Sequence, residues 1–186
     1  MKTFLTTRLV AVLMLAMSSG LAHNVLKKDS AKVCLEVVGV AIGENSEPID
    51  GVQVKLLKEN EEMEWMEITS VSYHDHDFTF ALEANSYYTI EVTKPGYVKR
   101  SVAISTHLPE KIDYSEIFKY GFEVMMFKEK KAVDDYYYDF PVALVSYNPR
   151  TEVFENNLSY TRHIKGKIKE AEAQASTGKE KSAPKK

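Results

Sequence analysis

The sequence predicts an all-β protein: a seven-stranded antiparallel sandwich over residues 31–128, followed by a hairpin and a short amphipathic helix. Two observations carry this prediction. Short segments in which apolar and polar residues alternate recur along the chain, as expected of strands with one buried face. Turn formers such as Lys94-Pro95-Gly96 separate these segments, and no helical period lies between them, which favours two packed antiparallel sheets.

The seven expected strands follow one another in chain order. They cover residues 33–38, 52–56, 65–72, 76–82, 87–93, 97–104 and 117–128. The last strand carries the longest alternating stripe in the chain, which consists of Phe118, Tyr120, Phe122, Val124 and Met126. A stripe of this length indicates that the seventh strand completes the core.

The chain beyond the sandwich changes character twice. Residues 129–158 are expected to form an aromatic and acidic loop and a hairpin around the turn formers Asn148-Pro149-Arg150. Over residues 159–175, Ile164, Ile168 and Ala171 recur at helical spacing among charged residues, which predicts an amphipathic helix. Residues 176–186 hold no apolar side chain except those of one alanine and one proline, so we expect a disordered basic tail.

Residues 1–22 have the composition of a secretory signal peptide. Lys2 and Arg8 precede or open an apolar run over residues 9–17, and Gly20 and Ala22 suit a cleavage site before His23. The run is shorter than the roughly 20 apolar residues that span a bilayer, and no later segment qualifies. We therefore expect an exported chain without a transmembrane segment, located in the periplasm, outside the cell or at the cell surface.

Charge and cysteine content narrow the classes of function. Cleavage of the signal peptide removes Lys2 and Arg8 from 24 basic residues, which leaves 22 against 27 acidic ones, so the net charge of −3 becomes −5. An acidic chain argues against nucleic-acid binding, which needs a basic face. Cys34 is the single cysteine and cannot form an intrachain disulfide, so stability must come from the core.

Several segments occur in the order typical of one known family. They are Pro48-Ile49-Asp50-Gly51-Val52-Gln53-Val54, Phe78-Thr79-Phe80-Ala81-Leu82, Tyr88-Thr89-Ile90-Glu91-Val92 and Gly96-Tyr97. With these segments, residues 31–106 resemble the carboxypeptidase regulatory-like, or transthyretin-like, β-sandwich family, with an immunoglobulin-like arrangement of strands. Members usually carry Thr-Asp-x-x-Gly-x-Phe before the fourth strand, whereas residues 73–78 here contain no glycine. The signal peptide, residues 140–145 and Tyr160-Thr161 are also similar to uncharacterised exported proteins of Bacteroidota. The resemblance implies no peptidase activity.

Histidines suggest a metal site as one hypothesis. His74 and His76 lie two apart and would project to one face of a strand, where they are candidate ligands for zinc or copper. A free amine and imidazole at His23 would be a third ligand for copper. The alternative is a polar turn that leads into a strand. His107 and Glu110 match a His-x-x-Glu zinc signature, but the chain lacks the large catalytic domain that this signature serves, and we interpret the match as coincidence.

An aromatic and acidic segment gives a second hypothesis. Asp134, Asp135, Tyr136, Tyr137, Tyr138 and Asp139 are consecutive. Tyrosine rings stack on sugars and carboxylates accept hydrogen bonds from hydroxyl groups or bind calcium, so a carbohydrate-binding module that uses Tyr136, Tyr137 and Tyr138 is one interpretation. The other is that the rings dock an irregular connection onto the sandwich.

No pattern in the chain specifies a reaction. Cys34 has no positioned base, no serine lies in a glycine-flanked elbow, and no glycine-rich phosphate loop occurs. We therefore expect a non-catalytic module without a cofactor, with a binding or structural role in the cell envelope. An envelope protein or a polysaccharide is the expected partner, and the oligomeric state stays open.

Overall fold

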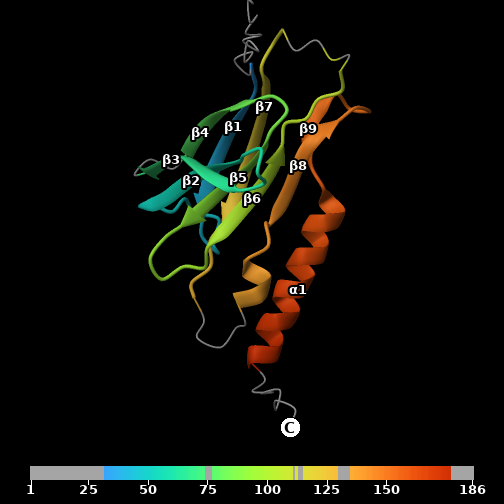
Figure 1. Cartoon of the computed structure of the whole chain (residues 1–186). Helices are drawn as coiled ribbons and strands as arrows, with labels where there is room; N and C mark the ends of the chain where they lie inside the picture. The colour runs from blue at the N-terminus through green and yellow to red at the C-terminus, as the bar shows by residue number, and fades with distance from the viewer. Residues whose placement is uncertain (1–31, 74–76, 111, 113–114, 130–134, 177–186) are drawn as a thin grey trace, which may run out of the picture. The chain divides into compact units, whose positions relative to one another are not determined.

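A computed structural model describes residues 32–73, 77–110, 112, 115–129 and 135–176. Within these residues, nine strands form two sheets that pack face to face, with one α-helix beside them (Figure 1). The strands are β1 (Val33–Ile42), β2 (Val52–Glu59), β3 (Trp65–Tyr73), β4 (Asp77–Glu83), β5 (Tyr87–Thr93), β6 (Arg100–Ser105), β7 (Phe118–Met125), β8 (Ala143–Asn148) and β9 (Val153–Asn156), and the helices are the 3-10 helix η1 (Asp135–Tyr138) and α1 (Leu158–Ser176). The prediction of an all-β sandwich is confirmed. None of the described helices is long and apolar enough to cross a membrane.

The sheet topology corrects two details of the prediction. The smaller sheet has the order β4-β1-β7 and the larger sheet has the order β3-β2-β5-β6-β8-β9. The described chain thus has nine sandwich strands instead of seven, because the hairpin β8–β9 joins the larger sheet beside β6. The sandwich is also not wholly antiparallel, since β7 runs parallel to β1 and β8 runs parallel to β6. After β6 the chain crosses to the smaller sheet as β7 and then returns, which allows β8 to run in the direction of β6.

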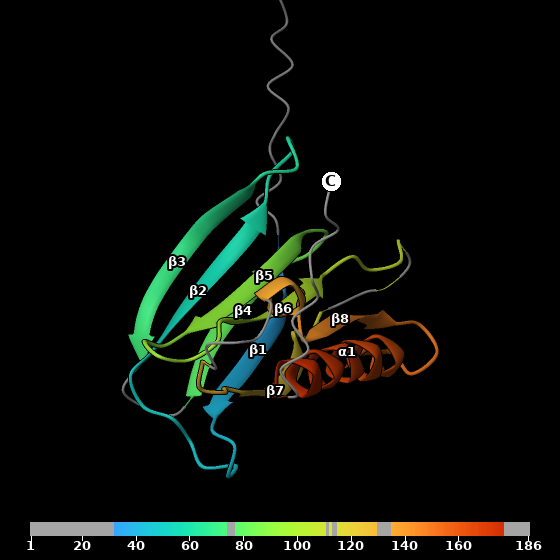
Figure 2. The same ribbon diagram turned by 90° about the horizontal axis from the view of Figure 1, so that it is seen from below.

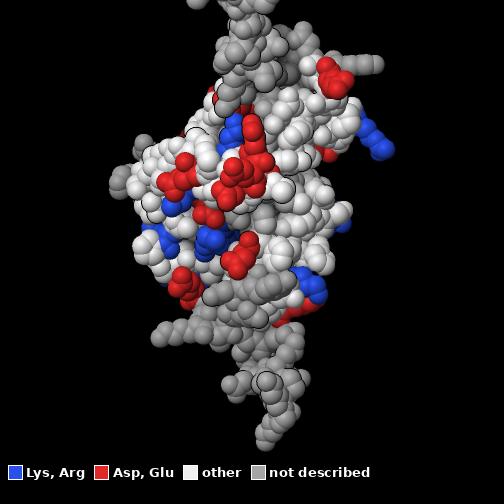
Figure 3. Space-filling view, viewed as in Figure 1, with Lys and Arg blue, Asp and Glu red and all other residues white. Residues whose placement is uncertain are grey.

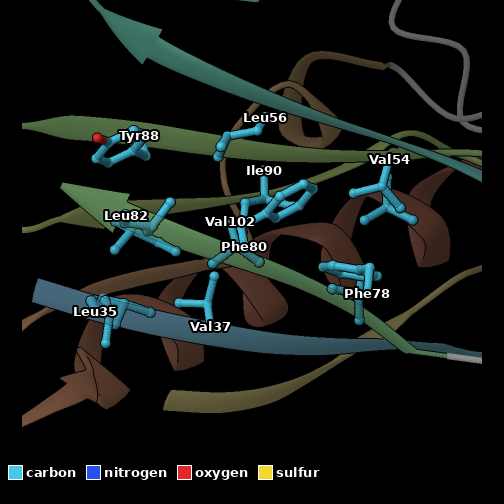
Figure 4. Packing of buried hydrophobic residues seen from close by; sticks show 14 of the residues in the cluster. Leu35, Val37, Val54, Leu56, Phe78, Phe80, Leu82, Tyr88, Ile90 and Val102 are labelled. Atoms are coloured by element: carbon cyan, nitrogen blue, oxygen red, sulfur yellow. The ribbon is translucent and has the colours of Figure 1, made fainter. Parts of the chain in front are cut away.

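The core lies between the two sheets. Figure 4 shows Val37 and Phe80 of the smaller sheet pointing toward Ile90 and Val102 of the larger sheet. All four side chains are buried. Burial of a side chain of this size contributes about 1.5–3 kcal/mol. The only cysteine, Cys34, is buried and free, so burial of apolar surface is the main source of stability.

A glycine makes room for the aromatic part of the core. Gly39 of β1 lies opposite Phe78 of β4, and a Cβ atom at position 39 would lie 2.2 Å from the Phe78 ring. The same ring meets Phe122 of β7 edge-on, with 5.8 Å between the ring centroids. The missing side chain at position 39 of β1 therefore lets aromatic residues from β4 and β7 pack together.

The helix α1 begins at a side-chain cap and packs on a small apolar cluster of its own. Asn157 Oδ1 accepts a hydrogen bond from the Tyr160 N–H at 3.0 Å, which satisfies one of the unpaired donors of the first turn. Ile164 and Ile168 are buried against Tyr138 of η1. Figure 2 shows α1 beside β7 and β8, so the helix covers the side of the sandwich on which the hairpin β8–β9 lies.

Candidate ligand-binding site

A cleft lies between α1 and the edge strand β7, with residues of β6 and β8 between them. Its volume of about 560 Å³ is in the range of small-molecule sites. The lining residues are Ile42, Arg100, Val102, Tyr120, Gly121, Phe122, Glu123, Met125, Phe127, Val142, Ala143, Asn156, Thr161, Lys165, Ile168 and Lys169. Apolar and aromatic residues predominate among them, as in most small-molecule sites.

The strand β7 supplies the aromatic wall of the cleft. Tyr120 and Phe122 are two residues apart and therefore project to the same side of the strand. Their rings are stacked, with 6.0 Å between the centroids and 26° between the planes. Burial raises the pKa of the Tyr120 hydroxyl above its usual value of 10.0, so this phenol is neutral at physiological pH. The wall is therefore apolar and uncharged.

The helix supplies the charged wall. Lys165 and Lys169 are four residues apart, so they lie on one face of α1 one turn from each other. Both are exposed, and neither forms an ion pair with another residue that the structure describes. Glu123 is the only acid among the described lining residues. The opening of the cleft thus carries an excess of positive charge over an apolar interior.

Arg100 is a second kind of cation in the cleft, because its side chain is buried. It is 5% exposed at the start of β6. Its guanidinium carbon lies 5.5 Å from the centroid of the Phe127 ring and 5.9 Å from that of Tyr138. Such cation–π contacts stabilise a desolvated guanidinium. Arg100 therefore ties β6 to η1 and to the segment after β7, and it helps to shape the inner end of the cleft.

The lining residues can bind a ligand but do not form a recognisable catalytic set. A nucleophilic mechanism needs an activated side chain beside a base. Cys34 lies in the core, where burial raises the pKa of its thiol to about 11, so the thiol stays protonated at neutral pH. Among the described residues, no group of three His, Cys, Asp or Glu side chains is placed to hold a metal ion.

The aromatic segment of the second hypothesis lies partly beneath α1. Tyr138 is 7% exposed and packs against Ile164 and Ile168, whereas Tyr137 is half-buried at the margin of the same cluster. Asp139 is exposed. Asp134 and the side chains of Asp135 and Tyr136 lie outside the described residues. The buried ring of Tyr138 docks η1 onto the helix, and recognition of a sugar by this segment stays a prediction for the other residues.

The histidines of the metal hypothesis fall in two groups. His23, His74 and His76 lie outside the described residues, so the metal hypothesis stays a prediction. His107 and Glu110 are both exposed after β6. The His107 ring lies 4.6 Å from the Tyr87 ring, centroid to centroid, and its Nδ1 is 3.2 Å from the hydroxyl of Ser105.

Sequence reasoning missed the cleft because its residues have ordinary patterns. Tyr120 and Phe122 belong to a stripe that we interpreted as core, and Lys165 and Lys169 belong to the polar face of an amphipathic helix. The one available signal was that the two lysines share a helix face, because they lie four residues apart.

Comparison with known proteins gives likenesses of fold and no family. No protein-family profile matches the sequence, and no curated protein matches it at a significant level. Among solved structures, 3-chlorocatechol 1,2-dioxygenase from Rhodococcus opacus has 10% identity and a TM-score of 0.38 over 55% of this chain and 62% of its own. Catechol 1,2-dioxygenase from Pseudomonas arvilla has 8% identity and a TM-score of 0.39 over 56% of this chain and 55% of its own. Sea bream transthyretin has 9% identity and a TM-score of 0.34 over 65% of this chain and 92% of its own.

The chain spans less than two thirds of the length of either dioxygenase. Identities and TM-scores this low transfer neither a site nor an activity from any of the three proteins.

Proposed function

We propose that this chain is an exported, non-catalytic β-sandwich module of the transthyretin-like, carboxypeptidase regulatory-like class that acts in the cell envelope. Its cleft binds a ligand that has an apolar body and an anionic group. The observation that carries this proposal is the pairing of an aromatic wall on β7 with two lysines on α1 that have no acidic partner among the described residues.

The two walls favour different parts of one ligand. Tyr120 and Phe122 offer ring surface to an apolar body, and burial of that body is favourable in proportion to its area. Lys165 and Lys169 attract a carboxylate or phosphate at the opening, where a charge keeps part of its hydration. A neutral ligand of the same shape gains only the first contribution.

A pair of probes separates the two contributions. Decanoate and decanol share an alkyl chain and differ in charge at neutral pH. Calorimetry should show that the protein binds decanoate about tenfold more tightly than decanol. The double variant Lys165→Glu and Lys169→Glu should lose this preference, because it replaces attraction by repulsion at the opening of the cleft.

Lys119→Glu is the matched control. Lys119 is an exposed lysine of β7 outside the cleft, so its reversal changes the net charge by as much as the single reversal Lys165→Glu or Lys169→Glu and should leave decanoate binding unchanged. Equal affinities for decanoate and decanol, or an equal loss in the control, would contradict the proposal.

A further inference from the structure

Two exposed aromatic rings lie on the outer face of the larger sheet, away from the cleft. Trp65 begins β3 and Tyr87 begins β5. Each side chain is 49% exposed, so neither belongs to the core. Exposed aromatic rings that share one face of a sheet are candidates for contact with a ligand.

The strand register places both rings on the same face. Trp65 lies directly opposite Glu59 of β2, and opposed residues in an antiparallel pair share a face. Lys58 and Tyr88 form the last pair of the β2–β5 ladder, and both side chains point toward the smaller sheet. Tyr88 is buried, and Lys58 Nζ lies 2.5 Å from Glu83 Oε2 of the smaller sheet. Because side chains alternate along a strand, the next residues, Glu59 and Tyr87, face outward.

The result is a row across three adjacent strands, Trp65, Glu59 and Tyr87. Neighbouring strands lie about 4.8 Å apart, so two strand spacings set the aromatic residues about 10 Å apart. His107 extends the row, since its ring packs on Tyr87 at 4.6 Å and its Nδ1 lies 3.2 Å from Ser105 Oγ. We call Trp65, Glu59, Tyr87 and His107 the aromatic platform.

Charge around the aromatic platform selects its ligand. The hairpin that leads from β2 to β3 carries Glu61, Glu62 and Glu64 next to Trp65. Figure 3 shows acidic and basic side chains interspersed over the part of the molecule formed by β2, β3 and β5. Next to Trp65 itself, however, the carboxylates of Glu59, Glu61, Glu62 and Glu64 repel anionic lipid headgroups and acidic polymers. They do accept hydrogen bonds from hydroxyl groups, which a neutral sugar supplies.

A second copy of the chain fits this face less well. Pairing of two β3 strands needs a regular edge, but the β2–β3 register shifts between Leu56 and Leu57. A bulge of this kind twists an edge strand away from further pairing.

The geometry points to a carbohydrate-binding site on the aromatic platform, for a neutral polysaccharide chain. Pyranose rings stack on Trp65 and Tyr87, whose spacing is close to the length of a disaccharide, and the Glu59 carboxylate between them accepts hydrogen bonds from sugar hydroxyls. Residues on paired strands hold such a site in a fixed geometry.

Trp65 is the only tryptophan in the chain, so its fluorescence reports on the site directly. Titration with cellohexaose, xylohexaose and mannohexaose should give a saturable change of emission with at least one of these neutral sugars. Polygalacturonate, which is anionic, should give none. In affinity electrophoresis or calorimetry, Trp65→Ala and Tyr87→Ala should each weaken binding of that sugar about tenfold. Tyr87→Phe should bind like the natural chain, because it keeps the ring.

Met66→Ala is the matched control, because Met66 is equally exposed next to Trp65 but lies opposite Lys58 and so on the other face of β3. It should leave sugar binding unchanged, as should the Lys165→Glu and Lys169→Glu variant of the cleft. The proposal is overturned if none of the three sugars changes the emission, if Met66→Ala weakens binding as much as Trp65→Ala, or if polygalacturonate binds equally well. The proposal would also be overturned, in favour of self-association, if the emission shifted with protein concentration in the absence of sugar and sedimentation showed a dimer.

Discussion

The two flanks of the larger sheet carry similar strands but have different surroundings. Three strands of the smaller sheet cannot cover six, so strands of the larger sheet extend beyond it. On the flank of β8 and β9, α1 and η1 supply the missing cover. On the flank of β3, no described element does, and Met66 and Val71, which lie on the face toward the smaller sheet, are exposed. Thus an alternating pattern produces core on one flank and surface on the other, according to what lies opposite.

This difference also separates the two proposed sites. We call the flank of β8 and β9 the covered flank and the flank of β3 the bare flank. The covered flank encloses a cleft with walls from two layers, which suits a small ligand that is largely surrounded. The bare flank offers an open face of paired strands, which suits a long polymer that no cleft would admit.

A pair of isoleucines should show the largest effect. Ile168 on the covered flank is 7% exposed, and Ile68 on the bare flank is 51% exposed. In urea denaturation, Ile168→Ala should lower the free energy of unfolding by about 2–4 kcal/mol, because it leaves a cavity against Tyr138. Ile68→Ala should cost less than about 1 kcal/mol. Similar losses at the two positions would mean that the bare flank is covered in solution.

Alkaline pH should weaken the core that both flanks share. Burial raises the pKa of the Cys34 thiol from 9.0 to about 11, so the unfolded chain loses this proton at lower pH than the folded chain. The contribution of the protonated thiol to the free energy of unfolding is therefore complete below pH 9 and is lost as the pH rises through 11. This loss amounts to about 2–3 kcal/mol. The free energy of unfolding, measured by denaturation at several pH values from 8 to 11, should fall less with rising pH for Cys34→Ala than for the natural chain. An identical pH dependence of the two proteins would contradict the prediction.

The smallest effect on the free energy of unfolding is expected for the ion pair that joins β2 on the bare flank to β4 of the smaller sheet. The Lys58 ammonium hydrogen-bonds to Glu83, which raises its pKa above the usual 10.5, so the contribution is present below that pH and lost above it. Both side chains are partly exposed, and Lys58→Ala should cost less than about 1 kcal/mol at neutral pH. The cost should shrink in 1 M salt. Lys55→Ala, which removes an ion pair to Glu67 within the larger sheet, provides the comparison. A cost for Lys58→Ala that salt does not change would point to packing on Tyr88 instead of charge.

The sequence was sufficient for the strands and insufficient for their partners. Alternation in residues 118–126 shows which side chains share a face, but the same stripe fits a strand that runs parallel or antiparallel to its neighbour. The parallel pairing of β7 with β1 and the union of β8 with β6 depend on how the chain crosses between the sheets, which no local pattern records.

The candidate sites could not be predicted from the sequence for a related reason. Trp65 and Tyr87 are 22 residues apart in sequence (87 − 65), and they share a face only through the register of both with β2. A shift of one residue in either register would turn one ring inward. Similarly, Lys165 and Tyr120 meet at one cleft only because α1 folds back beside β7.

The parallel pair of β1 and β7 has a consequence for how the chain folds. The first pair of this ladder joins Leu35 to Phe118, so 83 residues (118 − 35) form a loop that must close before the smaller sheet is complete. Contacts this distant in sequence slow folding, because the entropy of the loop is lost before the ladder compensates for it. The first core strand to leave the ribosome thus receives its last neighbour only after residue 125 has emerged, and until then one of its edges stays available for recognition by a chaperone.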